Sequence, residues 1–171
     1  AAVSRIALAV ALGLAATAPA RAQTAITPDV GNAFAVGTTV SDIGGAITID
    51  GGTRAGANLF HSFTRFDLGV GATARWTAAD PGGIANVVNR VTGGQASTIA
   101  GTLDSMALPN AAFWFINPAG VVFGAGAQGN VPGPAHFSTA SYLDFADGQR
   151  FTVAAPGGST LSVAAPEAWG F

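Results

Sequence analysis

Short apolar runs between closely spaced turn residues are the feature that most constrains how this chain can fold. From Gln23 onward, pairs such as Asp-Gly, Gly-Gly, Asn-Pro and Pro-Gly recur along the sequence. The runs between these turn signals are about four to nine residues long, which is the length of strands and too short for ordinary helices. Many short strands separated by turns are typical of a β-sandwich, a β-barrel or a β-solenoid.

We interpret these runs as strands. They cover residues 34–40, 46–50, 58–66, 86–91, 97–103, 111–116, 142–145, 151–155 and 160–164. The segment 86–91 has an alternative, because Ile84, Val87, Val88 and Val91 also have the spacing of one face of a helix. A strand is favoured there, since Val and Ile are β-branched and glycine pairs bracket the segment closely.

Two of these strands show how the sheets should pack. In 111–116 the residues on both faces are apolar, which is more typical of a parallel sheet than of a sandwich with one wet face. The alternation of apolar strand and turn that continues from there suits the stacked coils of a solenoid. In 58–66, simple alternation places Phe60 and Phe66 on one face and Phe63 on the other, which favours core packing over an aromatic binding stripe.

The first 22 residues are predicted to be a secretory signal peptide. Arg5 precedes an apolar run, and Ala20-Arg21-Ala22 has the small-x-small pattern of a cleavage site. The run is too short for a transmembrane anchor, which needs about 20 apolar residues. We therefore expect one domain over residues 23–171, preceded by the signal peptide 1–22.

The composition of the remaining chain limits its partners. Without residues 1–22 the sequence has five arginines, no lysine and nine carboxylates, a net charge of −4, which disfavours nucleic acid and anionic membranes as partners. It has no Cys, although export would permit disulfides. A chain without disulfides stays threadable through a narrow pore.

No catalytic, metal or cofactor site is expected from the sequence. His61 and His136 are the only histidines, and neither lies in a metal-ligand pattern. The GxGxxG match at 124–129 is followed by prolines where a phosphate-binding helix would have to run. Asp144 and Asp147 are interpreted as turn residues rather than a glycosidase pair. These observations favour a protein that is not an enzyme.

The segment Asn117-Pro118-Ala119-Gly120 separates two apolar runs. Asn at the first position, Pro at the second and Gly at the fourth predict a type I turn. We therefore expect one strand to end at Ile116 and the next to begin at Val121.

Three segments, taken together, resemble a known family. They are GGTRAGANLFHSFTRFDL (51–68), NVVNRVTGGQASTIAGTL (86–103) and AAFWFINPAGVVFGAGA (111–127). In this order they are similar to the N-terminal secretion (TPS) domain of filamentous-haemagglutinin-like exoproteins of two-partner secretion, and the similarity runs from about residue 25 to residue 171. The positions that carry the pattern are Asn58, Leu59, Phe60, His61, Phe63, Asn89, Gly93 and Gly94.

The resemblance implies a fold, a partner and a location. The fold is all-β, a right-handed parallel β-helix with extra β-hairpins and an N-terminal cap. The partner is an outer-membrane transporter whose periplasmic domains recognise the secretion domain before the exoprotein crosses unfolded and folds outside. The protein would thus be secreted or attached to the cell surface and not integral to a membrane. A β-helix that stopped at Phe171 would expose an open coil edge, so we expect either the front part of a longer exoprotein or a truncated gene product.

The resemblance also identifies candidate site residues. The family's turn motif Asn-Pro-Asn-Gly-Ile aligns with Asn117, Pro118, Ala119, Gly120 and Val121. Ala119 replaces the second Asn, which puts in doubt any role that needs that amide. The family's other motif should fall near residues 93–97, where it is not recognisable.

Two other classes remain as alternatives. An outer-membrane β-barrel is suggested by the terminal Trp169 and Phe171, although Pro166 interrupts that segment and lipid-facing alternation is missing. A β-helical enzyme acting on polysaccharide would need a groove with clustered acidic residues or arginines. No such cluster can be read from the sequence, although distant residues could still converge.

Overall fold

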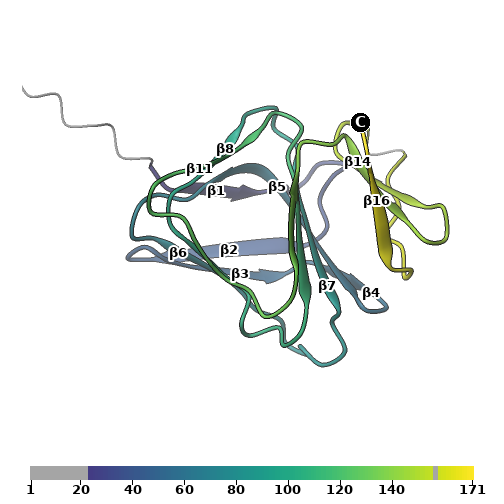
Figure 1. Ribbon diagram of the computed structural model, residues 1–171, viewed down its shortest axis with the longest axis horizontal. Coiled ribbons are helices and arrows are strands. Elements are labelled where there is room, and N and C mark those ends of the chain that lie inside the picture. The colour runs from purple at the N-terminus through teal and green to yellow at the C-terminus, as the bar shows by residue number, and fades with distance from the viewer. Residues whose placement is uncertain (1–22, 156–157) are drawn as a thin grey trace, which may run out of the picture.

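The computed structural model describes residues 23–155 and 158–171. Within them the chain forms a right-handed parallel β-helix, so the expected fold class is confirmed. Figure 1 shows three sheets that enclose an interior, with a fourth sheet against the outside of one of them. The predicted signal peptide, 1–22, lies outside the described residues.

The three sheets of the solenoid are built from successive coils. Sheet A contains β1 (Ala25–Pro28), β4 (Thr53–Ala55), β5 (Asn58–Asp67), β7 (Asn86–Val91), β10 (Ala112–Ile116) and β13 (Ala135–Ser138). Sheet B contains β2 (Thr38–Ile43), β3 (Ala46–Gly51), β6 (Thr73–Trp76), β9 (Thr102–Asp104) and β12 (Gln128–Asn130). Sheet C contains β8 (Ser97–Ile99) and β11 (Val121–Phe123).

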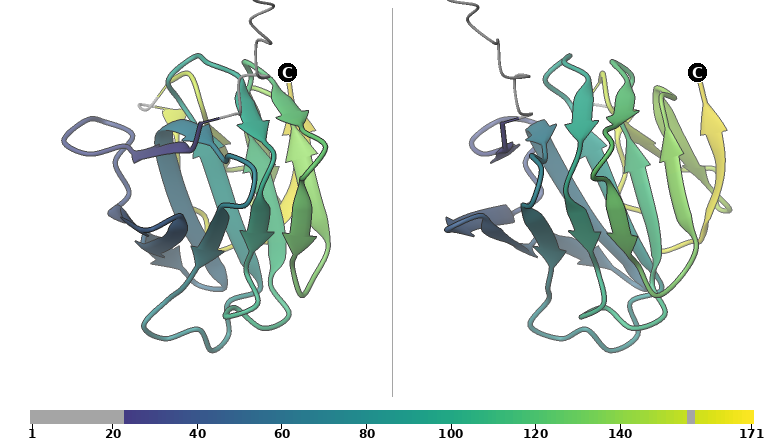
Figure 2. Two further views of the ribbon diagram at one scale, coloured as in Figure 1. Left: turned by 90° about the vertical axis from the view of Figure 1, so that its left-hand side faces the viewer. Right: turned by 60° about the vertical axis from the view of Figure 1, so that its left-hand side comes forward.

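The coils that begin with β7 and β10 visit sheets A, C and B in turn, and each coil lies beside the one before it. The coil that begins with β5 passes sheet C only through an isolated bridge between Leu68 and Ile99. β5, β7, β10 and β13 are therefore parallel neighbours in sheet A (Figure 2). Asn58 pairs with Asn86, which pairs with Ala112, so equivalent positions are 28 and 26 residues apart. The strand predicted over 86–91 is confirmed and the helical alternative is wrong, because Val87 and Val91 face the interior while Val88 faces outward.

Antiparallel elements add the cap and the extra hairpins. At the N-terminal end, β1 pairs with β5 and β2 pairs with β3, both antiparallel. A fourth, antiparallel sheet (sheet D) contains β14 (Tyr142–Phe145), β15 (Arg150–Thr152) and β16 (Pro166–Gly170). At the opposite end of the solenoid, β11, β12 and β13 each lie at the edge of their sheet.

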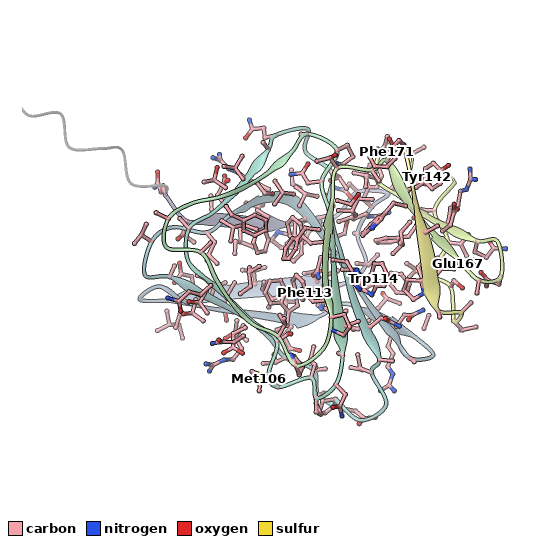
Figure 3. The ribbon with its side chains drawn as sticks, viewed as in Figure 1. Met106, Phe113, Trp114, Tyr142, Glu167 and Phe171 are labelled. Carbon is pink, nitrogen blue, oxygen red and sulfur yellow. The ribbon has the colours of Figure 1, made fainter. Side chains whose placement is uncertain are left out.

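β10 of sheet A is apolar on both of its faces because both are covered. Phe113 and Phe115 of β10 lie in the solenoid interior, whereas Trp114 between them faces sheet D (Figure 3). The second core, between sheets A and D, contains Phe60, Val88, Leu143, Phe145 and Phe151. The sequence-based expectation of a doubly buried strand at 111–116 is thus confirmed, and parallel pairing accounts for it.

The alternation expected for the phenylalanines of β5 is wrong for Phe66. Phe63 and Phe66 both lie in the interior, with ring centroids 5.3 Å apart, whereas Phe60 faces sheet D. The pairing with β1 shifts register between Phe63 and Arg65, so Thr64 is an extra residue. A bulge at this position changes which face the following side chains occupy. All three phenylalanines are nonetheless fully buried, as core packing requires.

Several expected strand boundaries also need correction. The strand expected over 34–40 begins only at Thr38, the one over 97–103 is divided between β8 and β9 by a corner, and the one over 151–155 ends at Thr152. Residues 160–164 are not a strand. The Asn58 side-chain amide donates to the carbonyl oxygens of Ser162 and Ala164, so these acceptors are satisfied without a neighbouring strand. The strand that follows is β16.

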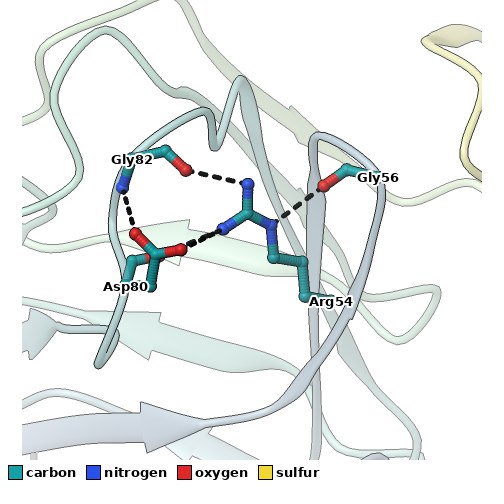
Figure 4. A network of polar contacts seen from close by, with 4 residues as sticks. All are labelled: Arg54, Gly56, Asp80 and Gly82. Carbon is teal, nitrogen blue, oxygen red and sulfur yellow. Dashed lines mark hydrogen bonds and ion pairs between the residues drawn. The ribbon is translucent and has the colours of Figure 1, made fainter.

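An arginine joins two loops at one edge of sheet A (Figure 4). Arg54 Nε donates to the Gly56 carbonyl at 2.9 Å, and Nη2 donates to the Gly82 carbonyl at 2.8 Å. Nη1 lies 3.5 Å from the Asp80 carboxylate. About a third of the Arg54 side chain and most of the Asp80 side chain are exposed, so water screens this ion pair. The main effect of Arg54 is to hold the loop before β7 against the turn before β5 through its bonds to the two carbonyls.

Candidate functional site

The turn predicted after β10 forms one corner of the solenoid. The Gly120 amide donates to the Asn117 carbonyl at 3.0 Å, which closes the turn, and the Ala119 amide donates to Asn117 Oδ1 at 3.0 Å. β10 and β11 on either side belong to sheets A and C, so the turn redirects the chain between sheets rather than closing a hairpin. Pro118 and Ala119 are exposed at its tip.

Asn117 ties this turn to the corner of the preceding coil. Its side chain is fully buried, and Nδ2 donates to the Gln95 carbonyl and to Ser97 Oγ, both at 2.9 Å. The Ser97 amide in turn donates to the Gly120 carbonyl at 3.0 Å. We call the two linked turns, residues 92–97 and 117–121, the stacked corner.

The lower turn of the stacked corner depends on two glycines. A side chain at Gly93 would overlap the carbonyl oxygen of Thr64, so only a glycine fits there. Gly94 has φ +72°, the left-handed region that favours glycine. This turn occupies the place at which the family's second motif was expected, and its glycines supply the geometry without that motif.

The stacked corner lies between two hollows in the surface. One, of about 150 Å³, contains residues from both turns and from the segment after β15: Val91, Thr92, Gly94, Asn117, Pro118, Ala119, Val153 and Ala154. The other, of about 260 Å³, is more polar and contains Gln23, Arg65, Asp67, Gln95, Ala96 and Thr98. The exposed tips of the two turns therefore form a ridge that a partner could approach from either side.

The other positions that carried the family resemblance are buried and do not form part of this ridge. Leu59, Phe60 and Phe63 are core residues of β5. Asn58 binds the carbonyls of the segment before β16, as described above. Asn89 faces the interior, where its Oδ1 accepts from Trp76 Nε1 at 2.8 Å. In this structure these residues shape the fold and do not form a surface.

His61 is the most unusual of these buried positions. Its Nδ1 lies 3.3 Å from Thr38 Oγ1, and its Nε2 has no hydrogen-bond partner. Burial lowers the pKa of His61 to about 3, although the nearby Asp50 carboxylate acts in the opposite direction. The ring is therefore neutral at physiological pH and packs as part of the core.

The described residues offer little for catalysis or metal binding. Nowhere in 23–155 and 158–171 do three His, Asp or Glu side chains gather as metal ligands would. Asp144 lies within β14 and pairs with Arg150, with Nε 2.8 Å from Oδ1, while Asp147 accepts the Gln149 amide in the following turn. Within the same residues, no helix has the length and apolar character needed to cross a membrane.

Sequence reasoning missed a buried polar cluster beneath the stacked corner. Asp29 and Arg90 are 1% and 2% exposed. Thr92, at the start of the lower turn, donates to the Asp29 carboxylate. The available signal was an arginine inside the predicted strand 86–91, where a buried charge is unusual unless it is satisfied.

Comparison with known proteins places the sequence in a family and identifies similar proteins. The sequence matches the family described as the TPS secretion domain over residues 24–168. A heme/hemopexin-binding protein of Haemophilus influenzae is 38% identical over 94 residues, which are 55% of this chain and 9% of that protein. The crystal structure of the HMW1 secretion domain from Haemophilus influenzae has a TM-score of 0.48 and 22% identity, covering 74% of this chain and 28% of that chain.

Because the family match extends over most of its length, the chain belongs to the TPS secretion domain family. The resemblance drawn from the three quoted segments is thereby confirmed. These are secretion domains of two-partner-secretion exoproteins, which reach the cell surface or the medium, and the family is not one of enzymes.

Proposed function

We propose that this domain is the secretion signal of a two-partner-secretion exoprotein and that the periplasmic domains of a cognate outer-membrane transporter recognise it. The observation that carries the proposal is the stacked corner, whose exposed tips are held by the buried Asn117 side chain. A rigid exposed ridge costs little conformational entropy on binding. The domain acts as a recognition module rather than as an enzyme.

Strand addition would supply part of the affinity. A segment of the domain would pair with a sheet edge of the transporter through main-chain hydrogen bonds, which need no particular side chains. The domain has free edges of its own, since β13 and β16 each lie at the end of their sheets. The ridge would then set the position at which the strands meet.

Folding outside the cell would make the export directional. Each coil buries apolar side chains against the previous one, as Phe113 and Phe115 do in the interior. Such burial contributes about 25 cal/mol per Å² of apolar surface. A chain that folds coil by coil therefore resists sliding back through the transporter, and this domain would provide the first coils.

Binding of the purified domain to the periplasmic domains of its transporter tests the recognition surface. We expect Ala119→Arg, at the exposed tip of the ridge, to weaken binding by about tenfold or more, because the larger charged side chain blocks the approach. The matched control is Ala79→Arg, since Ala79 is exposed in the loop before β7, at the opposite end of that strand. Equal affinities for both variants would contradict the assignment of the ridge.

A further inference from the structure

Arg90 has hydrogen-bond partners in three distant parts of the chain. It lies on the outward face of β7, and its guanidinium is covered by sheet D and by the segment between β1 and β2. Nε donates to Ser62 Oγ at 2.8 Å, and Nη2 donates to the Phe34 carbonyl at 2.9 Å. Nη1 donates to the Thr152 carbonyl at 2.6 Å and to Ser159 Oγ at 2.9 Å.

Aromatic rings from the same two ends enclose the guanidinium. Its central carbon lies 5.0 Å from the centroid of the Phe34 ring and 4.2 Å from that of Phe151. Phe34 precedes the cap hairpin, whereas Phe151 belongs to β15. One side chain from the middle of the sequence therefore contacts both ends of the domain.

A buried carboxylate balances this charge. Ser62 Oγ, which accepts from Arg90, donates to Asp29 Oδ2 at 2.6 Å, and Asp29 also accepts from Thr64 and Thr92. Burial raises the pKa of Asp29, but its several hydrogen bonds outweigh burial and the pKa is lowered overall. Burial lowers the pKa of Arg90 to about 10, opposed by Asp29, so both groups are charged at neutral pH.

A buried charge is tolerated only when its partners are all in place. If the segment around Ser159 detached, two of the four hydrogen bonds of Arg90 would be lost. If the segment around Phe34 detached, the guanidinium would lose its hydrogen bond to the Phe34 carbonyl and its contact with the Phe34 ring. In either case the Arg90 guanidinium loses hydrogen-bond partners in a poorly hydrated site. Its remaining contacts with the segment at the other end of the domain are then weakened as well.

We infer that Arg90 couples the N-terminal segment 29–36 to a C-terminal segment made up of residues 150–155 and 158–160, so that the two detach from sheet A together and not independently. The contacts between Phe34 and Arg90 reach their full strength only when the chain up to Ser159 is present. The two segments thus close over sheet A as one cooperative unit once Ser159 is in place, although the coils between them stack one after another.

Amide hydrogen exchange of the purified domain tests the coupling. We expect Arg90→Met to accelerate exchange by about tenfold or more at both Asp29 and Val153, whose amides are bonded to Ser62 and Ser141. The matched control is Arg150→Met, which removes a half-exposed arginine from β15 of sheet D. It should leave the Asp29 amide unchanged. Acceleration at only one end in Arg90→Met would overturn the inference.

A milder variant covers the case in which Arg90→Met does not fold. Ser159→Ala removes one acceptor at the C-terminal end and touches nothing at the N-terminal end. If Arg90 couples the two, exchange should also accelerate at Asp29, by about fivefold. A change confined to the C-terminal segment would show that the two ends open independently and would overturn the inference.

Discussion

The side chain of Asn117 is fully buried, and all three of its hydrogen bonds go to the two turns of the stacked corner. Pro118 and Ala119, in contrast, are exposed. The residue that determines the geometry of the ridge is thus hidden beneath the residues that form its surface. Substitutions should therefore separate the structural role of Asn117 from the role of the exposed residues in binding.

We expect Asn117→Ala to lower the free energy of unfolding by about 2 kcal/mol, because the Gln95 carbonyl and Ser97 Oγ lose a buried donor. Urea denaturation of the purified domain measures the effect. Asn130→Ala is the matched control, since Asn130 is exposed in β12, and it should change stability by less than about 0.5 kcal/mol. Similar losses for both variants would contradict the role of Asn117.

The domain should become less stable as the pH is lowered, because of His61. Its pKa is about 3 in the folded chain and 6.5 in a model compound, so below pH 6.5 the unfolded chain binds a proton that the folded chain does not. Stability should therefore decrease by about 1.4 kcal/mol per pH unit as the pH falls from 6 to 4.

Urea denaturation at several pH values tests this effect. The lowered pKa of Asp29 gives a contribution that is lost only as the pH falls below the ordinary value of 3.8, so the two effects occupy different ranges. We expect His61→Asn to remove most of the slope between pH 6 and 4. If the variant kept the slope of the wild type, another group would have to be responsible.

At the scale of elements, the turns and strands differ in how well the sequence predicts them. The strand 86–91 and the turn at Asn117 could be predicted, because β-branched residues and the Asn-Pro-x-Gly pattern act locally. The bulge at Thr64 could not, because it depends on pairing with β1. The strand predicted over residues 160–164 was wrong for a similar reason, since Asn58, about 100 positions away in the sequence, binds carbonyls of that segment.

The upper turn of the stacked corner has a position that only glycine tolerates well. Gly120 has φ +126°, and a Cβ there would lie 3.3 Å from the Ala96 Cβ of the lower turn. We expect Gly120→Val to strain the turn, to push the two turns apart and to impair secretion by the cognate transporter. Ala119→Asn, which places the family's Asn at an exposed position, should leave secretion intact or improve it.

Quantitative immunoblotting of culture medium from cells that carry the transporter measures both variants. Cell lysates serve as the control for expression, and a protease-sensitivity assay shows whether each variant folds. Normal secretion of Gly120→Val would mean that the turn is a passive connection. The assignment of a secretion role to residues 117–121 would then have to be abandoned.

At the scale of the whole molecule, the two ends of the solenoid differ. The N-terminal end is covered by antiparallel strands, whereas the other end presents β11, β12 and β13 together with the exposed side chains of Val122 and Phe123. Free strand edges with apolar neighbours invite pairing with further strands. This difference between the two ends suits a domain from which folding proceeds in one direction.

The overall architecture could be predicted from the sequence, but its internal connections could not. Turn spacing and doubly apolar strands indicated a solenoid, and the family resemblance supplied the cap and the extra hairpins. The hydrogen bond between Ser62 and Asp29 joins residues 33 positions apart, and the one between Arg90 and Ser159 joins residues 69 positions apart. Periodicity carries no information about such contacts, because they depend on how many residues each coil contains.

The central claim is tested most directly by secretion of a reporter fused after Phe171 in cells with and without the cognate transporter. The account predicts that the fusion reaches the medium only when the transporter is present and stays in the periplasm when it is absent. Release at the same level without the transporter would contradict it.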